Sequence, residues 1–400
     1  MSTTTLFRIE RAAVDEIISL LRREHYTVVG PVPRGASIEL GELRSTADLP
    51  LGCADEQKPG TYRLVRLPAD SLFSYTVSPH SWKRYLFPPV VRMFSATRTN
   101  KGFDFTSDGG EVTRASVPVV RDTPPSYAFL GIRSCDLHAL AVQDKVFGGG
   151  TYGDEYYRQA RERTWIIAVN CTLVGGTCFC ESMKTGPKVS SGFDLALTEI
   201  LTGREHYFLT EVGTDRGRAL LERVSHRPAE DSEVLMSEEL MENASHQMGR
   251  SLNTENVRQI LYQNTEHPRW DAVAARCLTC ANCTLVCPTC FCTTMEDSVD
   301  LGGTRAERLR KWDSCFTMDF SYIHGGSVRS SVRARYRHWL THKLASWIDQ
   351  FGLSGCVGCG RCITWCPVGI DITEEYGAIR ASALTIGATS SPKEADDGNA

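Results

Sequence analysis

One cysteine spacing occurs twice in this sequence, and it constrains the fold more than any other feature. Both "CLTCANCTLVCP" and "CVGCGRCITWCP" follow the pattern C-x2-C-x2-C-x3-C-P. The cysteines of the first run are Cys277, Cys280, Cys283 and Cys287, and those of the second are Cys356, Cys359, Cys362 and Cys366. Three thiolates on one tight loop can bind three irons at one end of a cubane, while the fourth points toward a second cubane. The repeat therefore predicts two [4Fe–4S] clusters.

The two runs are expected to share their ligands. In two-cluster ferredoxins the fourth cysteine of each run binds the other cluster. The first expected set is therefore Cys277, Cys280, Cys283 and Cys366. The second expected set is Cys356, Cys359, Cys362 and Cys287. Zinc is the alternative, but a zinc site closes one tetrahedron with two C-x2-C pairs, and each run here has one cysteine too many for that.

The rest of the composition agrees with a metal-binding protein of the cytoplasm. The chain has 16 cysteines, mostly bunched at short spacings, which favours metal ligands over disulfides. Its N-terminus lacks the apolar core of a signal peptide, and no uncharged apolar run reaches about 18 residues, so no membrane span is expected. A formal net charge of −4 gives no indication of a nucleic-acid surface.

Four cysteines in the N-terminal half are candidates for a third cluster. Cys135 follows the expected strand "YAFLGI", and Cys171 follows the expected strand "WIIAVN". If these strands are parallel neighbours, both thiols lie at the carboxyl edge of one sheet, where α/β proteins build their sites. Cys178 and Cys180 lie on the loop just after Cys171, so four thiols can converge there. The alternatives are a redox-active group of reduced thiols and buried cysteines that act as small hydrophobic residues.

Three further cysteines have no clear assignment. Cys290 and Cys292 follow directly on a cluster ligand in "PTCFC", and Cys315 lies in "WDSCF". They can form three corners of a further site, serve as alternative ligands during assembly, or exclude water from the clusters by packing. Cys53 stands alone among polar residues and is interpreted as incidental.

The pattern of apolar residues predicts an α/β region followed by a helical one. Strand candidates alternate with helix candidates up to about residue 226, which indicates a parallel sheet with helices on both faces. The chain is accordingly divided into an N-terminal α/β region (1–125), a parallel α/β region that carries the candidate third cluster (126–226) and a strand-free connector (227–254). A mainly α-helical dicluster domain of helical-ferredoxin type (255–385) and a disordered tail (386–400) follow.

A basic stretch lies between the two cysteine runs. "SVRSSVRARYRHWLTHKL" contains Arg329, Arg333, Arg335, Arg337 and Lys343 and no acidic residue. A cubane with four thiolate ligands carries net negative charge, so nearby cations can stabilise it and raise its reduction potential. The alternatives are a solvated helix face and a docking face for an acidic partner.

Several long motifs together resemble one known family. "CLTCANCTLVCPTCFC", "WDSCF", "RYRHWLTHKL" and "CVGCGRCITWCPVGIDI" resemble the iron–sulfur beta subunit of cytoplasmic NAD(P)-linked nickel–iron hydrogenases, also called sulfhydrogenases. They are also similar to the A subunit of anaerobic sulfite reductase. "GIRSCDLHAL" and "CTLVGGTCFCESMKTGP" match the N-terminal half of the family, so the resemblance covers roughly residues 125 to 380.

The resemblance implies an electron-transfer subunit that is not catalytic alone. In such complexes a flavin subunit handles NAD(P)H, and the catalytic nickel–iron or sirohaem-type site lies in another subunit. In agreement, no G-x-G-x-x-G follows a strand candidate here. Two rival hypotheses are a sulfur-reducing site at the four cysteines of the α/β region and a regulatory iron–sulfur protein that senses oxygen. The hydrogenase and sulfite reductase assignments, and the choice between NADH and NADPH, remain open at this point.

Overall fold

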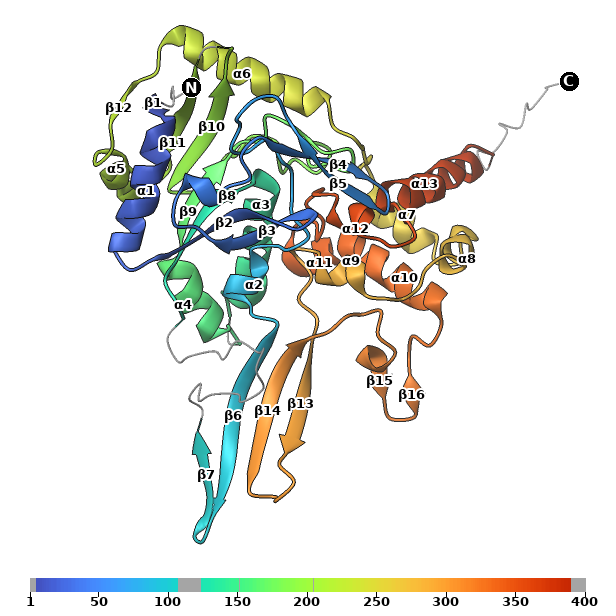
Figure 1. Cartoon of the computed structure of the whole chain (residues 1–400). Helices are drawn as coiled ribbons and strands as arrows, with labels where there is room; N and C mark the ends of the chain where they lie inside the picture. The colour runs from blue at the N-terminus through green and yellow to red at the C-terminus, as the bar shows by residue number, and fades with distance from the viewer. Residues whose placement is uncertain (1–4, 107–123, 151, 204, 390–400) are drawn as a thin grey trace, which may run out of the picture.

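An eight-stranded mixed sheet forms the centre of the N-terminal half (Figure 1). The computed structural model describes residues 5–106, 124–150, 152–203 and 205–389. The strand order is β12-β1-β11-β10-β9-β8-β2-β3. Its strands are β1 (Leu6–Glu10), β2 (Thr27–Arg34), β3 (Ser37–Glu42), β8 (Tyr127–Ile132), β9 (Trp165–Val169), β10 (Leu195–Leu201), β11 (His206–Val212) and β12 (His226–Pro228). The sheet therefore takes strands from both of the regions that the sequence analysis separates at residue 125.

Only the middle of this sheet is parallel. Strands β2, β8, β9 and β10 run parallel to one another, and every residue of β9 is buried, as is usual for a strand covered on both faces. The expectation of a parallel region over 126–226 is wrong for β11, which is antiparallel to β10. Only residues 202–205 join these two strands, which is long enough for a hairpin but too short for a parallel crossover.

Helices cover both faces of the sheet because side chains alternate along each strand. Val28, Leu130 and Ile167 face α1 and α5. Their neighbours in the same strands, Val29, Phe129 and Ile166, face α2, α3 and α4. The long helix α6 packs against Leu209 and its neighbours on β10 and β11. These helices are α1 (Arg11–Arg23), α2 (Lys83–Leu86), α3 (Ser134–Phe147), α4 (Glu155–Arg163), α5 (Asp215–Leu221) and α6 (Asp231–His246).

The C-terminal half contains short helices around its own apolar core. They are α7 (Val257–Gln263), α8 (Arg269–Ala274), α9 (Asn282–Leu285), α10 (Val332–Thr341), α11 (Trp347–Phe351), α12 (Arg361–Thr364) and α13 (Ile372–Thr389). A π-helical turn, η3 (His342–Ser346), joins α10 to α11. Trp270, Tyr336 and Trp339 form the aromatic centre of this core, and several cysteines of the two runs pack against it.

This half is less helical than its sequence predicts. It also contains β13 (Thr293–Val299), β14 (Arg305–Trp312), β15 (Tyr322–Ile323) and β16 (Gly326–Ser327). Strands β13 and β14 carry charged residues on both faces, held by cross-strand ion pairs such as that of Arg308 with Asp297 at 2.6 Å. A strand without alternating apolar residues gives no period-2 signal, which explains why the sequence did not reveal this hairpin.

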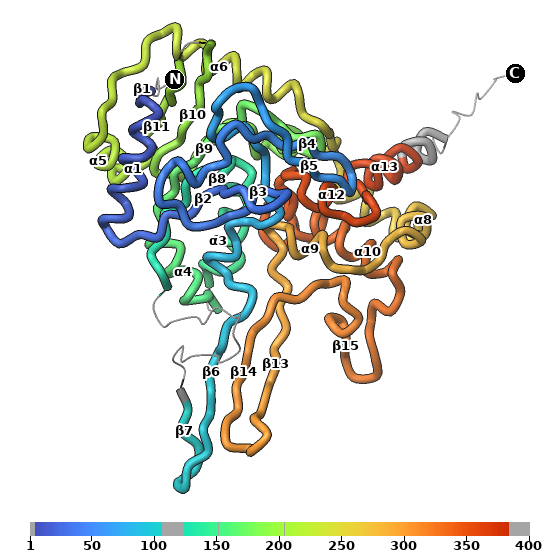
Figure 2. Tube along the Cα trace, in the orientation of Figure 1, coloured from blue at the N-terminus to red at the C-terminus, as the bar shows by residue number. Residues whose placement is uncertain are grey.

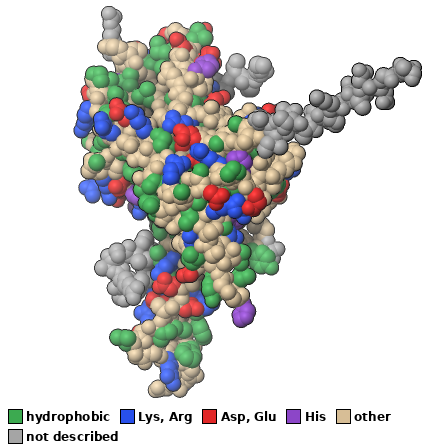
Figure 3. Space-filling view, turned by 90° about the vertical axis from the view of Figure 1, so that its right-hand side faces the viewer, with side chains coloured by type: hydrophobic (Ala, Val, Ile, Leu, Met, Phe, Trp, Pro, Cys, Tyr) green, Lys and Arg blue, Asp and Glu red, His purple; other side chains and the backbone are tan. Residues whose placement is uncertain are grey.

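The β13–β14 hairpin joins a second hairpin to form an arm. Strand β14 pairs with β6 (Val90–Thr99), and β6 pairs with β7 (Gly102–Thr106), so segments about 200 residues apart share one four-stranded sheet. Figures 1 and 2 show this arm extending away from the rest of the molecule. Figure 3 shows hydrophobic side chains toward its narrow end, where Phe103, Phe105 and Leu301 are exposed.

Another hairpin connects the two halves. Strands β4 (Cys53–Lys58) and β5 (Thr61–Arg66) pair with each other, and the N–H of Gly60 at their turn donates to the carbonyl of Ile363 at 3.0 Å. The expected connector, 227–254, begins within β12 and is then mostly helix α6. Helix α13 extends into the expected disordered tail as far as Thr389, and residues 390–400 of that tail lie outside the described part of the chain. None of the described helices is long and apolar enough to span a lipid bilayer.

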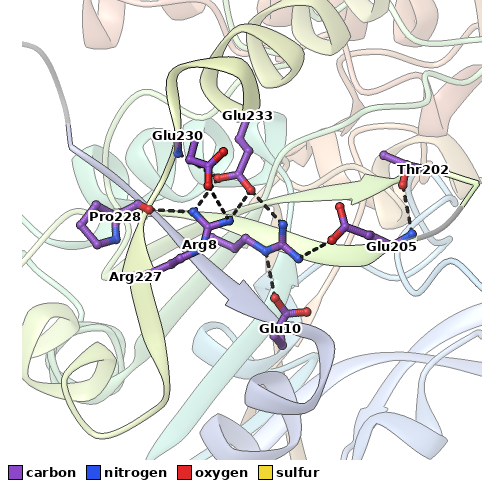
Figure 4. A network of polar contacts seen from close by, with 8 residues as sticks. All are labelled: Arg8, Glu10, Thr202, Glu205, Arg227, Pro228, Glu230 and Glu233. Carbon is purple, nitrogen blue, oxygen red and sulfur yellow. Dashed lines mark hydrogen bonds and ion pairs between the residues drawn. The ribbon is translucent and has the colours of Figure 1, made fainter.

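A charged network attaches α6 to the edge of the large sheet (Figure 4). Glu233 accepts hydrogen bonds from Arg8 of β1 at 2.9 Å and from Arg227 of β12 at 2.6 Å. Arg8 also contacts Glu10 and Glu205, and its guanidinium lies 3.9 Å from the centre of the Tyr207 ring. Burial alone would raise the pKa of Glu233, but the bonds from the two arginines outweigh it and lower the pKa from 4.5 to about 2.

Replacing Glu233 by Gln should lower the free energy of unfolding at pH 7 by about 1–2 kcal/mol, because two arginines lose their charged partner. Since the folded-state pKa lies below the unfolded one, this contribution is present above pH 4.5 and disappears as the pH falls toward about 2. Urea unfolding at pH 7 and pH 3 measures both effects. Glu230→Gln, whose carboxylate is 70% exposed and 3.7 Å from Arg227, serves as the control with little effect.

Candidate metal centre

The first expected ligand set lines a single apolar pocket. Its lining includes Cys277, Cys280, Cys283 and Cys366 together with Leu278, Phe316, Tyr336, Trp339 and Val368. The loop after α8 turns through two residues in the left-handed region, Thr279 and Ala281. The N–H of Thr279 donates to Cys277 Sγ at 3.4 Å, and the N–H of Ile370 donates to Cys366 Sγ at 3.3 Å. The fold thus brings together the four cysteines that the spacing assigns to one cluster.

The second expected set lies deeper. Burial raises the pKa of Cys362, and the nearby Cys356, Cys359 and Cys287 raise it further, so these four sulfurs lie close together. As in the first set, backbone N–H groups point at the sulfurs. Gly358 donates to Cys356 and Arg361 donates to Cys359, which offsets part of the rise in pKa that burial imposes on each thiol.

The two sets are neighbours, and their surroundings fit iron–sulfur clusters. Burial raises the pKa of Cys283, and Cys287, a member of the other set, is among the thiols that raise it further. Burial raises the pKa of Tyr336, and Cys283 and Cys362, one from each set, raise it further. The buried hydroxyl of Tyr336 has no hydrogen-bond partner among the described residues. Donors aimed at sulfur are the usual surroundings of a protein-bound cubane.

The four cysteines of the candidate third site also converge. Strands β8 and β9 are parallel neighbours, as expected, so Cys135 in the first turn of α3 and Cys171 after β9 share one sheet edge. Burial raises the pKa of Cys180, and so do Cys178 and Cys171. Burial also raises the pKa of Cys178 to about 12. The pKa values of Cys135, Cys178 and Cys180 are raised first by burial and further by Cys359 of the second set. The candidate third site therefore adjoins the dicluster domain.

Buried charges surround this third group of thiols. The guanidinium of Arg133 donates to the carbonyls of Phe73 and Tyr75 at 2.7 Å, and it also lowers the pKa of Cys171, which burial raises. Arg361 donates to Asp136 at 2.9 Å, and Asp136 Oδ1 and Arg361 Nη1 are buried without a hydrogen-bond partner in the described chain. Such orphaned polar atoms beside four thiols fit a bound charged group.

Cys290, Cys292 and Cys315 are arranged differently from the three sets. The thiol of Cys290 donates a hydrogen bond to Cys287, and the thiol of Cys315 donates one to Cys292. This bond lowers the pKa of Cys292 to about 7; burial opposes the change, and Lys343 supports it. These thiols are thus in pairwise contact. Cys53 belongs to the core between α1 and the sheet.

Two glycines let the second cysteine loop lie against the α/β half. Gly358 and Gly360 have positive φ angles of 64° and 74°. A Cβ on Gly358 would lie 2.6 Å from the carbonyl oxygen of Phe179, and a Cβ on Gly360 would lie 2.5 Å from that of Thr177. The loop of the dicluster domain is therefore packed directly on the loop that carries Cys178 and Cys180.

The basic stretch divides between surface and interior. Arg333 and Arg337 form ion pairs with Glu266 at 2.8 Å on the surface, as the solvated-face alternative expects. Lys343 is buried instead, and its Nζ lies 3.1 Å from Cys287 Sγ. One stretch of sequence thus supplies both a surface ion pair and a cation at a candidate ligand.

Comparison with known proteins agrees with this geometry. The profile of a family described as "4Fe-4S dicluster domain" matches residues 276–370, which contain both cysteine runs. The beta subunit of sulfhydrogenase 2 from Pyrococcus furiosus is 30% identical over 266 residues, covering 66% of this chain and 77% of that subunit. The chain belongs to the iron–sulfur hydrogenase beta-subunit family. No solved structure matches.

Several residues around the centre of this beta-subunit-like protein were missed in the sequence. Lys83, about 200 residues before the cysteines it approaches, donates to the carbonyls of Cys287 and Cys290 at 3.1 and 2.9 Å, and nothing local marks it. Arg361 lies inside the motif "CVGCGRC", so a charged residue between two ligands was a visible signal. In the described chain no three Cys, His, Asp or Glu side chains are placed to hold a single metal ion, and the ligands of a cubane bind separate irons.

Gly358→Ala should destabilise the protein and reduce its bound iron, because the added Cβ meets the backbone of Phe179 and Cys180. Gly352→Ala is the matched control, since Gly352 also has a positive φ, 73°, but open space around its Cβ position. In the control, the free energy of unfolding should fall only by the strain of a left-handed alanine, about 1–2 kcal/mol. Equal losses of urea stability and iron in the two variants would contradict the packing role of Gly358.

Cys292 should react as a thiolate near neutral pH. Its rate of alkylation by iodoacetamide in the anaerobic iron-loaded protein, followed by mass spectrometry, should rise through a midpoint of about pH 7. Cys315→Ala removes the hydrogen-bond donor and should move that midpoint toward the value of a free thiol, about 8.5. A midpoint that does not change in the variant would show that Cys315 does not act on Cys292.

Proposed function

We propose that this chain is the electron-transfer subunit of a cytoplasmic multi-subunit oxidoreductase, in which two [4Fe–4S] clusters are held by the interleaved sets described above. The observation that carries the proposal is the adjacency of the two sets. Cys362, assigned to the second cluster, lines the same pocket as the four cysteines assigned to the first. When bound, the clusters supply one-electron transfer.

The position of each set favours a path across the molecule. Cys280 is exposed, and Leu278 beside it is 60% exposed, so the first set lies at the surface. Cys356 and Cys359 of the second set are buried between the two halves. The chain's own part in this function is to fix the ligands, exclude water around the inner set and leave one cysteine accessible at the surface.

We also propose a third [4Fe–4S] cluster at Cys135, Cys171, Cys178 and Cys180. Its support is the convergence of these thiols beside Cys359 and the buried guanidinium of Arg133. Arg133 forms no ion pair among the described residues, although, against the effect of burial, the buried Glu199 helps to raise its pKa. A buried cation of this kind is stabilised by a further negative group nearby. Four thiolates on a cubane provide such a group, whereas four protonated thiols do not.

The family relationship extends the proposal to the type of complex. The Pyrococcus furiosus relative is a beta subunit of a sulfhydrogenase. By analogy, we propose a flavin subunit that handles NAD(P)H on one side of this chain and a nickel–iron catalytic subunit on the other. Residues 255–385 would then form the redox domain, with 1–125 and 126–226 as its α/β support and 227–254 as the connection.

Iron content tests the number of clusters. Anaerobically purified protein should contain about twelve irons and twelve acid-labile sulfides per chain, because each cubane holds four. Cys178→Ala should reduce both to about eight. Cys53→Ala is the matched control: it also replaces a buried thiol, but one in the core near α1, and should leave the iron unchanged.

The other outcomes of this measurement separate the parts of the proposal. About eight irons in the wild type and in Cys178→Ala would remove the third cluster but keep the two of the dicluster domain. Little iron with stoichiometric zinc in anaerobic preparations would contradict the electron-transfer function itself.

A further inference from the structure

The two clusters of the dicluster domain have different electrostatic surroundings. Lys343, only 3% exposed, directs its ammonium at the second set. Its Nζ lies 3.1 Å from Cys287 Sγ, 3.3 Å from Thr289 Oγ1 and 3.2 Å from the carbonyl oxygen of Gly355. Cys290 Sγ is slightly further away, at 3.6 Å. These neighbours are all neutral or thiol groups, so the only negative charge that they can offer the ammonium is that of sulfur.

The backbone around Lys343 forms a π-helical turn, which directs its side chain toward the ligand sulfur. Lys343 lies in the π-helical turn η3 between α10 and α11. A π turn inserts one extra residue into a helix and re-aims the side chains that follow, and such turns are frequent at functional sites. Arg333 and Arg337, in the regular helix before the turn, reach Glu266 on the surface instead. Lys343 is the cation of this stretch that lies within the turn itself, whereas the buried Arg335 belongs to the regular helix.

A second buried ammonium lies close by. Lys83, also 3% exposed, donates to the carbonyls of Cys287 and Cys290, and its Nζ lies 4.0 Å from the centre of the Trp312 ring. Lys83 thus fixes the backbone of the ligand segment, and Lys343 contacts the ligand sulfur itself.

No lysine or arginine nitrogen of the described chain contacts a sulfur of the first set, whose sulfurs accept backbone N–H bonds from Thr279 and Ile370. The nearby Arg335 is also buried, 6% exposed, but its Nη1 donates to the sulfur of Met318 at 3.6 Å and not to a cysteine. The two sets therefore differ in whether a cation is hydrogen-bonded to a ligand sulfur. The remaining walls of that pocket are largely apolar.

A third buried cation near the second set is already paired. Arg361 lies between Cys359 and Cys362 in the sequence, but it forms an ion pair with Asp136 at 2.9 Å, both side chains being 3% exposed or less. The net charge of that pair is zero. Of these three cations in the described chain, Lys343 is the one whose nitrogen contacts a ligand sulfur of the second set.

We propose that Lys343 makes the two clusters unequal by raising the reduction potential of the cluster bound through Cys287 above that of the cluster bound through Cys280. A hydrogen-bonded cation at a ligand sulfur favours the reduced cluster, which carries one more negative charge. The inner cluster is then reduced first and holds the electron, while the surface cluster exchanges electrons with a partner. This inference rests on the two-cluster function proposed above and assigns an order to it.

The test is a redox titration followed by electron paramagnetic resonance. In the wild type, the two cubane signals of the dicluster domain, which are those that Cys178→Ala retains, should appear at different potentials. In Lys343→Met, the higher midpoint potential should fall by at least about 59 mV, which for one electron is a tenfold change in the ratio of reduced to oxidised cluster. The lower midpoint potential should not change. Arg333→Met is the matched control, because it removes a cation of the same stretch that contacts only surface carboxylates, and neither midpoint should move.

A second measurement does not depend on how the variant folds. In wild-type protein grown with 15N-lysine, the dicluster signal that appears first on reduction should show coupling to lysine nitrogen, and the other dicluster signal should not. Coupling confined to the second signal, or no coupling at either, would overturn the inference, as would an unchanged higher midpoint in iron-replete Lys343→Met protein. Protein without two cubane signals would instead contradict the proposed two-cluster function.

Discussion

A thiolate in a protein interior is stable only where a metal, a cation or an N–H group offsets its charge, and that requirement organises the region where the two halves of this chain meet. Backbone N–H groups two residues further along the chain donate to Cys277, Cys356 and Cys359. Cations complete the compensation: Lys343 lies at Cys287, and Arg133 lies at the thiols of the α/β half.

The α/β half has a structural part in this arrangement. Parallel strands β8 and β9 end at one edge of the sheet and deliver Cys135 and Cys171 there. The loop that follows β9 then packs on the second cysteine loop, where Gly358 leaves space for it, and the hairpin β4–β5 holds the same region from another side through Gly60. The ligand loops of the dicluster domain are thus formed against a surface that the first half of the chain provides.

The sequence predicted what depends on local spacing. The repeated cysteine run led to both ligand sets, which the structure brings together, and strand–helix alternation placed Cys135 and Cys171 at one edge. It did not predict the arm, because β13 and β14 are stabilised by cross-strand charges and by pairing with β6 rather than by a buried face. Long-range contacts such as that of Lys83 with the carbonyl of Cys287 leave no local pattern at either residue.

The most direct test of the account is the electron paramagnetic resonance spectrum of the fully reduced protein under anaerobic conditions. If the two interleaved sets bind two cubanes, the reduced clusters are near neighbours, because Cys362 of the second set lines the pocket of the first set, and their spins must interact. The account therefore predicts a broadened spectrum with splitting that is absent when only one cluster is reduced. A fully reduced spectrum that equals the sum of independent cubane signals would contradict the interleaved ligand sets on which the account rests.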